Sequence, residues 1–249
     1  MRRLANVALL AASLQVLAAQ GPPASNQASA KTWVGRYQEF EEYLRTAECV
    51  SMQTLDVARA SRCTLPPGGP IARMAWRSTD GAVRGFHERY KAEIAAYELD
   101  KLLKLDMVPP SVERPIQGNT GAAQQWVEGA LAVRTDDLPN GPHRTEWENQ
   151  LARVTMFDNL IGNRDRNLAN MIRDAEWNLI LLDHSRAFGP GIDLPQKMTR
   201  IDSSLWKRIE GLTQKQLAAA LNKWIDESAI RAILDRRERM RAEIKLLAR

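Results

Sequence analysis

Three polar residues in the second half of the chain have the types and the spacing that phosphoryl transfer requires. Asp165 and Asn170 lie five residues apart in the polar segment GNRDRNLAN, and Asp183 follows thirteen residues after Asn170, at the end of an apolar run. Phosphoryl transfer needs a carboxylate that orients the attacking hydroxyl and accepts its proton. It also needs hard oxygen ligands for Mg²⁺ or Mn²⁺ beside the nucleotide phosphates. Asp165 could serve as the carboxylate, and Asn170 and Asp183 as the ligands.

The segments around these residues predict how they are positioned. Apolar residues recur at helical intervals over residues 146–161, and the polar loop follows this helix directly. Residues 171–173 and the mostly apolar run 177–182 predict a short hairpin that ends at Asp183. The order Asp-x-x-x-x-Asn, hairpin, Asp is the arrangement of kinase catalytic machinery. The alternative is a surface loop in which these residues make turns and caps. The surrounding helix and hairpin favour the catalytic interpretation.

The block FDNLIGNRDRNLANMIRDAEWNLILLDHSRAF resembles the atypical secretory-pathway kinases, which include the Golgi casein kinase and the xylose kinase of proteoglycan synthesis. It is more distantly similar to type II phosphatidylinositol 4-kinases and HipA-type kinases. A second block, RYKAEIAAYELDKLLKLDMVPPSVER, is similar to a helix of that family that leads into a Val-Pro-Pro stretch. The resemblance covers residues 86–188. It implies an α+β, bilobal kinase-like fold, with a small strand-containing lobe over about 32–128 and a mostly helical lobe over about 129–249.

The resemblance also implies roles for individual residues. Asp165 matches the catalytic Asp, Asn170 falls where the family has a metal-ligating or metal-proximal residue, and Asp183 matches the metal-binding Asp. Glu93, in a helix predicted over residues 88–105, matches the Glu that lies near the phosphates. Without the resemblance, Glu93 would be interpreted as an exposed helix charge paired with a neighbour one turn away. The implied cofactors are ATP and Mg²⁺ or Mn²⁺.

The nucleotide-binding lysine is the main departure from the family. The family has this Lys on a strand before the Glu helix, but here the strand-like segment IARMAWR, residues 71–77, ends in Arg77. Gly68 and Gly69 precede it, and no GxGxxG loop occurs. An Arg can clamp phosphate bidentately, although its geometry differs from that of an ammonium group. Either Arg77 binds the nucleotide in place of Lys, or the chain is a nucleotide-binding pseudokinase that acts as a regulatory or binding module.

Trp126 and Val127 are candidates for the hinge that hydrogen-bonds adenine. They end a strand predicted over residues 124–127, after a glycine turn, and another strand is predicted over 111–114. The alternative for such a strand is a plain core strand. The remaining periodic segments predict helices, at residues 33–44, 214–224 and 228–247.

The first residues of the chain indicate export. Arg2 and Arg3 precede an uncharged apolar run, residues 4–19, which ends in small residues and is followed by the breaker QGPP. This pattern predicts a secretory signal peptide over residues 1–19. The alternative, an uncleaved anchor, is disfavoured because the run is shorter than the ~20 residues that a membrane span needs. We therefore expect a secreted or periplasmic protein, with a flexible lead-in over residues 20–31 and a kinase-like domain over residues 32–249.

The two cysteines of the chain, Cys49 and Cys63, lie fourteen positions apart. In an exported protein such a pair is a candidate disulfide. The alternative is two buried free thiols. A zinc site is not favoured, because the three histidines are far apart and the sequence has no CxxC or HxxxH motif.

The composition excludes several classes of protein. With 249 residues, 44% of them hydrophobic and 26% charged, the chain is not a disordered, collagenous or polytopic membrane protein. The net charge of +5 falls to +3 without the two Arg residues of the signal peptide, and no dense basic run suggests nucleic-acid binding. We expect a nucleotide and a hydroxyl-bearing acceptor as partners, no membrane span after signal cleavage, and a monomer or an oligomer of unknown size. A further hypothesis, a helical exported protein with accidental motif matches, is disfavoured because all the site residues occur together.

Overall fold

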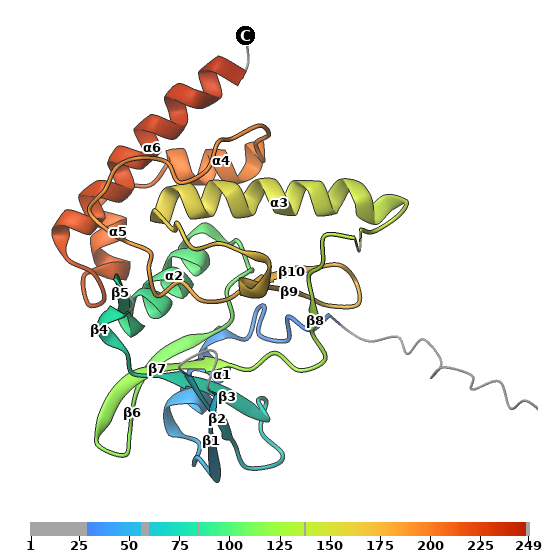
Figure 1. The fold of residues 1–249 in the computed structure, drawn as a ribbon, viewed down its shortest axis with the longest axis vertical. Coiled ribbons are helices and arrows are strands. Elements are labelled where there is room, and N and C mark those ends of the chain that lie inside the picture. The colour runs from blue at the N-terminus through green and yellow to red at the C-terminus, as the bar shows by residue number, and fades with distance from the viewer. Residues whose placement is uncertain (1–28, 56–59, 84, 137, 248–249) are drawn as a thin grey trace, which may run out of the picture.

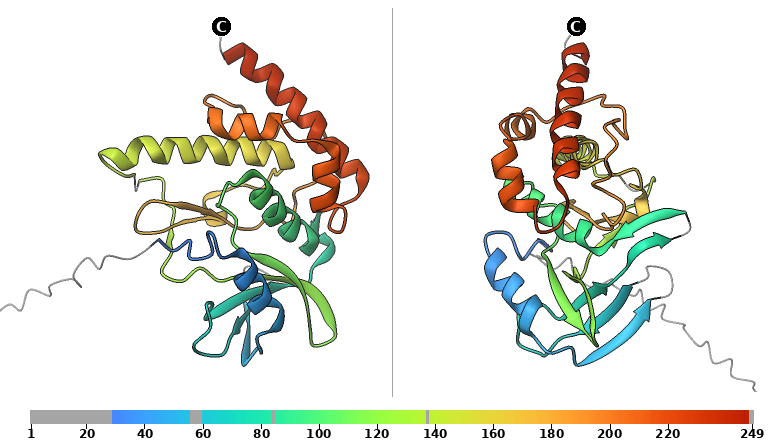
Figure 2. Two further views of the ribbon diagram at one scale, coloured as in Figure 1. Left: turned by 180° about the vertical axis from the view of Figure 1, so that it is seen from behind. Right: turned by 90° about the vertical axis from the view of Figure 1, so that its left-hand side faces the viewer.

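The computed structural model describes residues 29–55, 60–83, 85–136 and 138–247. Strands gather at one end of the molecule and most helices at the other, with helix α2 between the two groups (Figures 1 and 2). This arrangement confirms the expected α+β fold, with a strand-containing N-terminal lobe and a mostly helical C-terminal lobe. The expected signal peptide, residues 1–19, and most of the expected lead-in lie outside the described residues.

The N-terminal lobe is built on a five-stranded antiparallel sheet with the order β1-β2-β3-β7-β6. Its strands are β1 (Ser51–Leu55), β2 (Ala60–Thr64), β3 (Arg73–Arg77), β6 (Ser111–Ile116) and β7 (Asn119–Gln125). On one face, Met74 and Trp76 of β3 pack in the core with α1 (Tyr37–Thr46). Since side chains alternate along a strand, Ala75 and Arg77 face the opposite side. The sequence analysis missed β1 and β2, because β1 is largely exposed and shows no apolar alternation.

A two-stranded hairpin leads into the central helix of the N-terminal lobe. Strands β4 (Asp80–Val83) and β5 (Phe86–Arg89) pair with each other, and α2 (Tyr90–Leu103) begins directly after β5. The expected helix is confirmed, but its expected start at residue 88 was wrong, because residues 86–89 extend and pair with β4. Helix α2 is buried along most of its length, which its three alanines permit by allowing close packing.

The C-terminal lobe is organised around the long helix α3 (Pro142–Ile161). A three-stranded sheet of order β10-β9-β8 lies between it and the N-terminal lobe, formed by β8 (Leu131–Ala132), β9 (Met171–Arg173) and β10 (Leu179–Leu181). The pairing of β9 with β10 confirms the expected hairpin. The 3-10 turn η1 (Leu168–Asn170) and the helices α4 (Ser203–Glu210), α5 (Gln214–Leu221) and α6 (Glu227–Leu247) complete the lobe. The sequence analysis missed α4, a helix of eight residues that buries Leu205 and Ile209.

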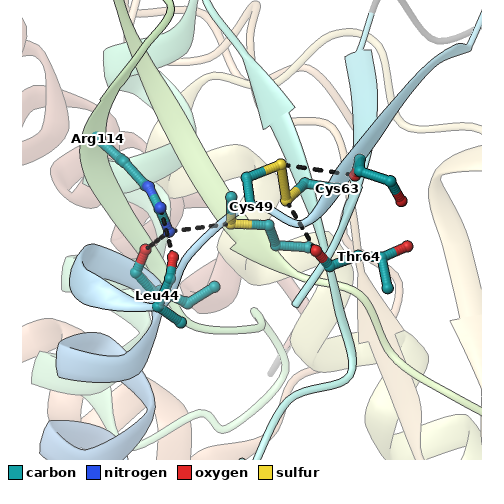
Figure 3. Close-up of a disulfide and its surroundings, with 8 residues drawn as sticks. Leu44, Cys49, Cys63, Thr64 and Arg114 are labelled. Carbon is teal, nitrogen blue, oxygen red and sulfur yellow. Dashed lines mark hydrogen bonds between the residues drawn. A yellow bond between two sulfur atoms is a disulfide. The ribbon is translucent and has the colours of Figure 1, made fainter. Parts of the chain in front are cut away.

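A disulfide between Cys49 and Cys63 ties the segment after α1 to β2 (Figure 3). The two Cα atoms are 5.7 Å apart. The guanidinium of Arg114 donates to the carbonyl of Leu44 nearby, at 2.8 Å, and so anchors the end of α1 to β6. The disulfide closes a loop over a sequence separation of 14, which contributes about 3 kcal/mol to stability in the chain-entropy model.

None of the helices within the described ranges is long and apolar enough to cross a membrane.

Candidate active site

A cavity of about 380 Å³ lies between the five-stranded sheet and the β9–β10 hairpin. Its walls come from both lobes: strands β3 and β7, helix α2, the β1–β2 hairpin, and the ends of η1 and β10. Six of the residues that the sequence analysis assigned to nucleotide or metal line it: Arg77, Glu93, Trp126, Val127, Asn170 and Asp183. These residues range from position 77 to position 183 in the sequence, and the fold brings them together at one cavity.

The register between β3 and β7 explains which side chains of the sheet line the cavity. Strands β3 and β7 are antiparallel neighbours, with Ala75 opposite Gln124 and Arg77 opposite Ala122. Directly opposite residues share a face of the sheet, so these four side chains lie on the cavity side together. Two of the four are alanines, and the short side chains leave the space that a planar base or sugar would fill.

Arg77 joins the two acidic residues of the cavity. Its guanidinium donates from Nη1 to Asp183 Oδ1 at 2.9 Å and from Nη2 to Asp183 Oδ2 at 3.2 Å. The Nη1 atom also lies 3.5 Å from Glu93 Oε1. The other carboxylate oxygen of Glu93 accepts the backbone N–H of His184 at 2.8 Å. Glu93 is therefore buried at the site and bonded across the two lobes, so the exposed helix charge considered as an alternative is excluded.

Asp183 is held as a carboxylate. Burial opposes its ionisation, but the charge and hydrogen bonds of Arg77, together with the hydroxyl of Ser185, lower its pKa to about 2. Ser185 Oγ donates to Asp183 Oδ1 at 2.7 Å. The backbone of Asp183 has a φ of 52°, in the left-handed region, which turns the chain away from β10 at this point. An ionised carboxylate facing a cavity is a suitable ligand for a hard divalent cation.

Asp165 and Asn170 occupy one tightly bonded loop. The backbone carbonyl of Asp165 accepts from Asn170 Nδ2 at 3.0 Å, which leaves Oδ1 as the amide atom that could ligate a cation. The backbone N–H of Asp165 donates to Asn163 Oδ1 at 3.1 Å. Asp165 itself lies outside the cavity wall, and its carboxylate is partly exposed. Within this loop, Asp165 lies outside the cavity, where it could face an acceptor, and Asn170 lines the cavity, where it could face a metal.

A buried ion pair that the sequence analysis did not identify organises this loop. Arg166 Nε and Nη2 donate to the two carboxylate oxygens of Asp158, at 3.0 and 3.1 Å. Arg166 Nη1 donates to the carbonyls of Asn170 and Leu182, each at 2.8 Å. One guanidinium therefore spans helix α3 and both ends of the β9–β10 hairpin. A signal was present in the sequence, since Asp158 is a charged residue inside the apolar stripe of the helix.

The hinge candidates are placed at the end of β7. The backbone N–H of Trp126 donates to the carbonyl of Arg73 at 3.1 Å, so this donor is used within the sheet. The Trp126 ring lies beside two guanidinium groups, those of Arg62 and Arg73, at 5.6 and 5.4 Å from their central carbons. Adenine could therefore bond to the carbonyl of Trp126 or the backbone of Val127, but not to the N–H of Trp126.

The glycine pair before β3 has no place in the cavity wall. Gly69 packs against the Tyr43 ring, in the turn between β2 and β3. The hairpin that borders the cavity is β1–β2, through Leu55 and Ala60. Its connection, residues 56–59, has the sequence DVAR without glycine and lies outside the described residues.

Comparison with solved structures identifies the fold. A structure titled as hydra Fam20 with sugar aligns with a TM-score of 0.65 at 17% identity, over 85% of this chain and 88% of that chain. The Golgi casein kinase aligns with a TM-score of 0.60 at 14% identity, over 84% of this chain and 74% of that chain. The Helicobacter pylori proinflammatory kinase CtkA aligns with a TM-score of 0.54 at 10% identity, over 82% and 95% of the two chains.

The chain has the fold of these atypical kinases. This confirms, at the level of fold, the resemblance found in two sequence blocks. No family model matches the sequence, and no curated protein matches it significantly. The similarity is therefore one of fold and not of overall sequence.

The cavity has the donor chemistry for a nucleotide-bound divalent cation. No cluster of three or more His, Cys, Asp or Glu side chains suited to a metal occurs among the described residues. The cavity is lined by two carboxylates, Glu93 and Asp183, and by the amide of Asn170. Glu93 is engaged by Arg77 and the backbone of His184, so Asp183 and the amide oxygen of Asn170 are the candidate ligands. Mg²⁺ is typically held by one or two carboxylates together with substrate phosphates and waters. These two residues fit such a cation, with the phosphates completing its shell.

Proposed function

We propose that the chain is an exported, ATP-dependent kinase that transfers a phosphoryl group to a hydroxyl of a protein, glycan or lipid acceptor. The observation that carries this proposal is the convergence of Arg77, Glu93, Asn170 and Asp183 on one cavity, with Asp165 in the adjoining loop. Solved structures of the same fold support it, one of them a Golgi casein kinase with Mn/ADP bound and another a Fam20 with sugar.

In the proposed reaction, Asp165 orients the acceptor hydroxyl and accepts its proton. The acceptor oxygen forms a bond to the γ-phosphorus while the bond to the β–γ bridging oxygen breaks, and ADP leaves. Asn170 and Asp183 would hold Mg²⁺ or Mn²⁺, which neutralises phosphate charge when bound. Arg77 would contact the phosphates, and Glu93 would keep Arg77 in the cavity.

Arg77 also supports a second candidate, a nucleotide-binding pseudokinase. Its bidentate pair with Asp183 occupies both oxygens of the carboxylate that would hold the metal. Metal binding by Asp183 requires Arg77 to release this carboxylate, at least in part. A chain in which the pair does not open would bind nucleotide without metal-dependent transfer.

Export is part of the proposal. The apolar run after Arg2 and Arg3 is typical of a signal peptide, and the Cys49–Cys63 disulfide suits an oxidising compartment. Nucleotide would then have to reach the protein outside the cytoplasm. Recovery of processed protein beginning near residue 20, from the periplasm or the medium, is the measurement that checks this part.

The decisive experiment measures both phosphoryl transfer and Mn–ADP affinity in one variant, Asp165→Asn. The protein without residues 1–19 is incubated with labelled ATP and Mn²⁺ or Mg²⁺, and transfer to water, casein and simple glycosides is measured. Asp165→Asn should lower turnover by about 10²–10⁴-fold, the usual contribution of a general base. Its affinity for Mn–ADP should stay within about twofold of the parent, because Asp165 does not line the cavity.

Asp193→Asn is the matched control, since Asp193 is also an exposed carboxylate paired with one Arg but lies outside the site. It should behave as the parent. Binding of Mn–ADP without any transfer by the parent would favour the pseudokinase. Absence of both binding and transfer would refute the proposed function.

A further inference from the structure

Arg186 lies between two carboxylates that come from different parts of the fold. Its Nη1 atom is 3.0 Å from Asp165 Oδ2. Its Nε and Nη2 atoms donate to Glu88 Oε1, at 3.2 and 2.8 Å. Within the described residues, Arg186 is the charged partner that the structure gives to the Asp165 carboxylate. Neither the phosphoryl-transfer motif nor the cavity includes Arg186 or Glu88.

The guanidinium of Arg186 is restrained on several sides. Glu88 is 5% exposed and lies in β5, paired with Gly81 of β4. The ring of Phe86 lies under the guanidinium, with its centre 4.3 Å from the central carbon. Two further bonds join the same strand to the segment that carries Arg186: Arg89 N–H donates to the carbonyl of Ser185 at 2.9 Å, and Arg89 Nη2 to that of Ala187 at 2.6 Å. The position of Arg186 is therefore fixed by the β4–β5 hairpin.

Other contacts of Asp165 fix only its backbone. The side chains of Asn163, Asn167 and Asn170 bond to its N–H and its carbonyl. The carboxylate itself is partly exposed, with 34% of the side chain accessible, and would otherwise sample several rotamers. The Arg186 contact engages Oδ2, so that Oδ1 is the oxygen that can accept a proton from an acceptor hydroxyl.

We propose that Arg186 is a positioning residue, which holds the Asp165 carboxylate for the acceptor hydroxyl, and that Glu88 holds Arg186 in turn. This inference rests on the proposed function. It makes the β4–β5 hairpin part of the acceptor side of the site, although the hairpin belongs to the N-terminal lobe. The ion-pair chain Glu88–Arg186–Asp165 links the two lobes beside the loop that carries Asp165.

The test measures ATP turnover separately from nucleotide affinity. Arg186→Met should lower kcat by about 10–100-fold, because misplacing a catalytic group by about 1 Å can cost about 100-fold in rate. The affinity for Mn–ADP should remain within about twofold of the parent. Glu88→Gln should lower kcat less, and the double variant should resemble Arg186→Met, since residues in one network are not additive.

Chemical rescue separates positioning from a general structural role. In Arg186→Ala, guanidinium chloride at concentrations far below those that unfold proteins should restore part of the lost kcat, and urea at the same concentrations should not. Arg153→Ala is the matched control, because Arg153 also bridges two carboxylates and has a similar exposure of 27%. It should keep the parent kcat and show no guanidinium effect.

The outcomes distinguish this inference from the proposed function. Parent turnover with an unchanged kcat in Arg186→Met overturns the inference alone. A loss of Mn–ADP affinity equal to the loss of kcat also overturns it, because the residue would then act on folding or nucleotide binding. A parent without any turnover overturns the proposed function, and this inference with it.

Discussion

Two Arg–Asp pairs in this molecule have nearly the same geometry and different surroundings. Arg166 bonds to both oxygens of Asp158 at 3.0 and 3.1 Å, and Arg77 bonds to both oxygens of Asp183 at 2.9 and 3.2 Å. The side chains of the first pair are 4% and 0% exposed. Those of the second pair are 13% and 29% exposed and line the cavity.

The further partners of each pair show the difference in role. Asp158 also accepts from Asn163 at 2.9 Å, and the guanidinium of Arg166 also bonds to two carbonyls, so the buried pair is saturated by fixed protein groups. The cavity pair has Glu93 and Ser185 beside it and an open face toward the space where phosphate and metal would lie. The same type of Arg–Asp pair can thus be structural, as in Arg166–Asp158, or can line a cavity where a ligand could replace one partner, as in Arg77–Asp183.

The largest expected effect is on stability at the buried pair. Arg166→Met should lower the free energy of unfolding by about 3–5 kcal/mol, because it leaves a buried carboxylate without its counter-charge. Urea unfolding followed by tryptophan fluorescence measures this change. Arg144→Met, which removes an exposed pair with Glu148, should lower the free energy of unfolding far less. Equal effects of the two substitutions would show that burial does not set the contribution of these pairs to stability.

The second prediction concerns ligand binding at the cavity pair. Asp183→Ala should weaken Mn–ADP binding by about 100-fold or more, because a neutral amide alone is a poor ligand for a hard cation. Calorimetric titration measures the affinity. The same variant should lose less stability than Arg166→Met, because Asp183 is less buried than the Arg166–Asp158 pair. An affinity close to that of the parent would remove Asp183 from the metal site.

The third prediction uses Arg77 as an internal competitor for the metal. Arg77→Ala should tighten binding of Mn²⁺ alone by about tenfold, or about 1.4 kcal/mol, while it weakens binding of nucleotide. Arg77→Lys should preserve or raise turnover, since an ammonium group can take the phosphate contact. Electron paramagnetic resonance of free Mn²⁺ gives the first affinity. Weaker Mn²⁺ binding in Arg77→Ala would show that the pair does not compete with the cation.

The smallest expected effect is on the pH dependence of stability. The pKa of Asp183 in the folded protein is about 2, below its ordinary value of 3.8, so the ionised form favours folding. This contribution is complete above about pH 4 and is lost as the pH falls through about 2. Because the group is partly exposed, we expect about 1 kcal/mol from it. Asp183→Asn should lower stability by this amount at pH 5, with the difference vanishing near pH 2 in urea titrations.

Much of the fold could be predicted from the sequence where structure is local. The expected helices at residues 33–44, 88–105, 146–161, 214–224 and 228–247 correspond to α1, α2, α3, α5 and α6, with ends that differ by at most four residues. Hydrophobic periodicity found these segments because each buries one face. The shorter elements β1, β2, β4, β5, β8 and α4 were missed. Strands β1 and β4 bury no side chain and so show no apolar alternation.

The sequence by itself determined the spacing of Asp165, Asn170 and Asp183, because a loop and a short hairpin fix these distances locally. It also determined the pairing of the only two cysteines as one candidate disulfide. Only the tertiary structure decided which arginine side chain pairs with which carboxylate. Arg77 and Asp183 are 106 residues apart, and Arg186 and Glu88 are 98 apart. Contacts over such separations leave no periodic trace in a sequence, since they depend on how the sheet, the β4–β5 hairpin and the catalytic loop pack against one another.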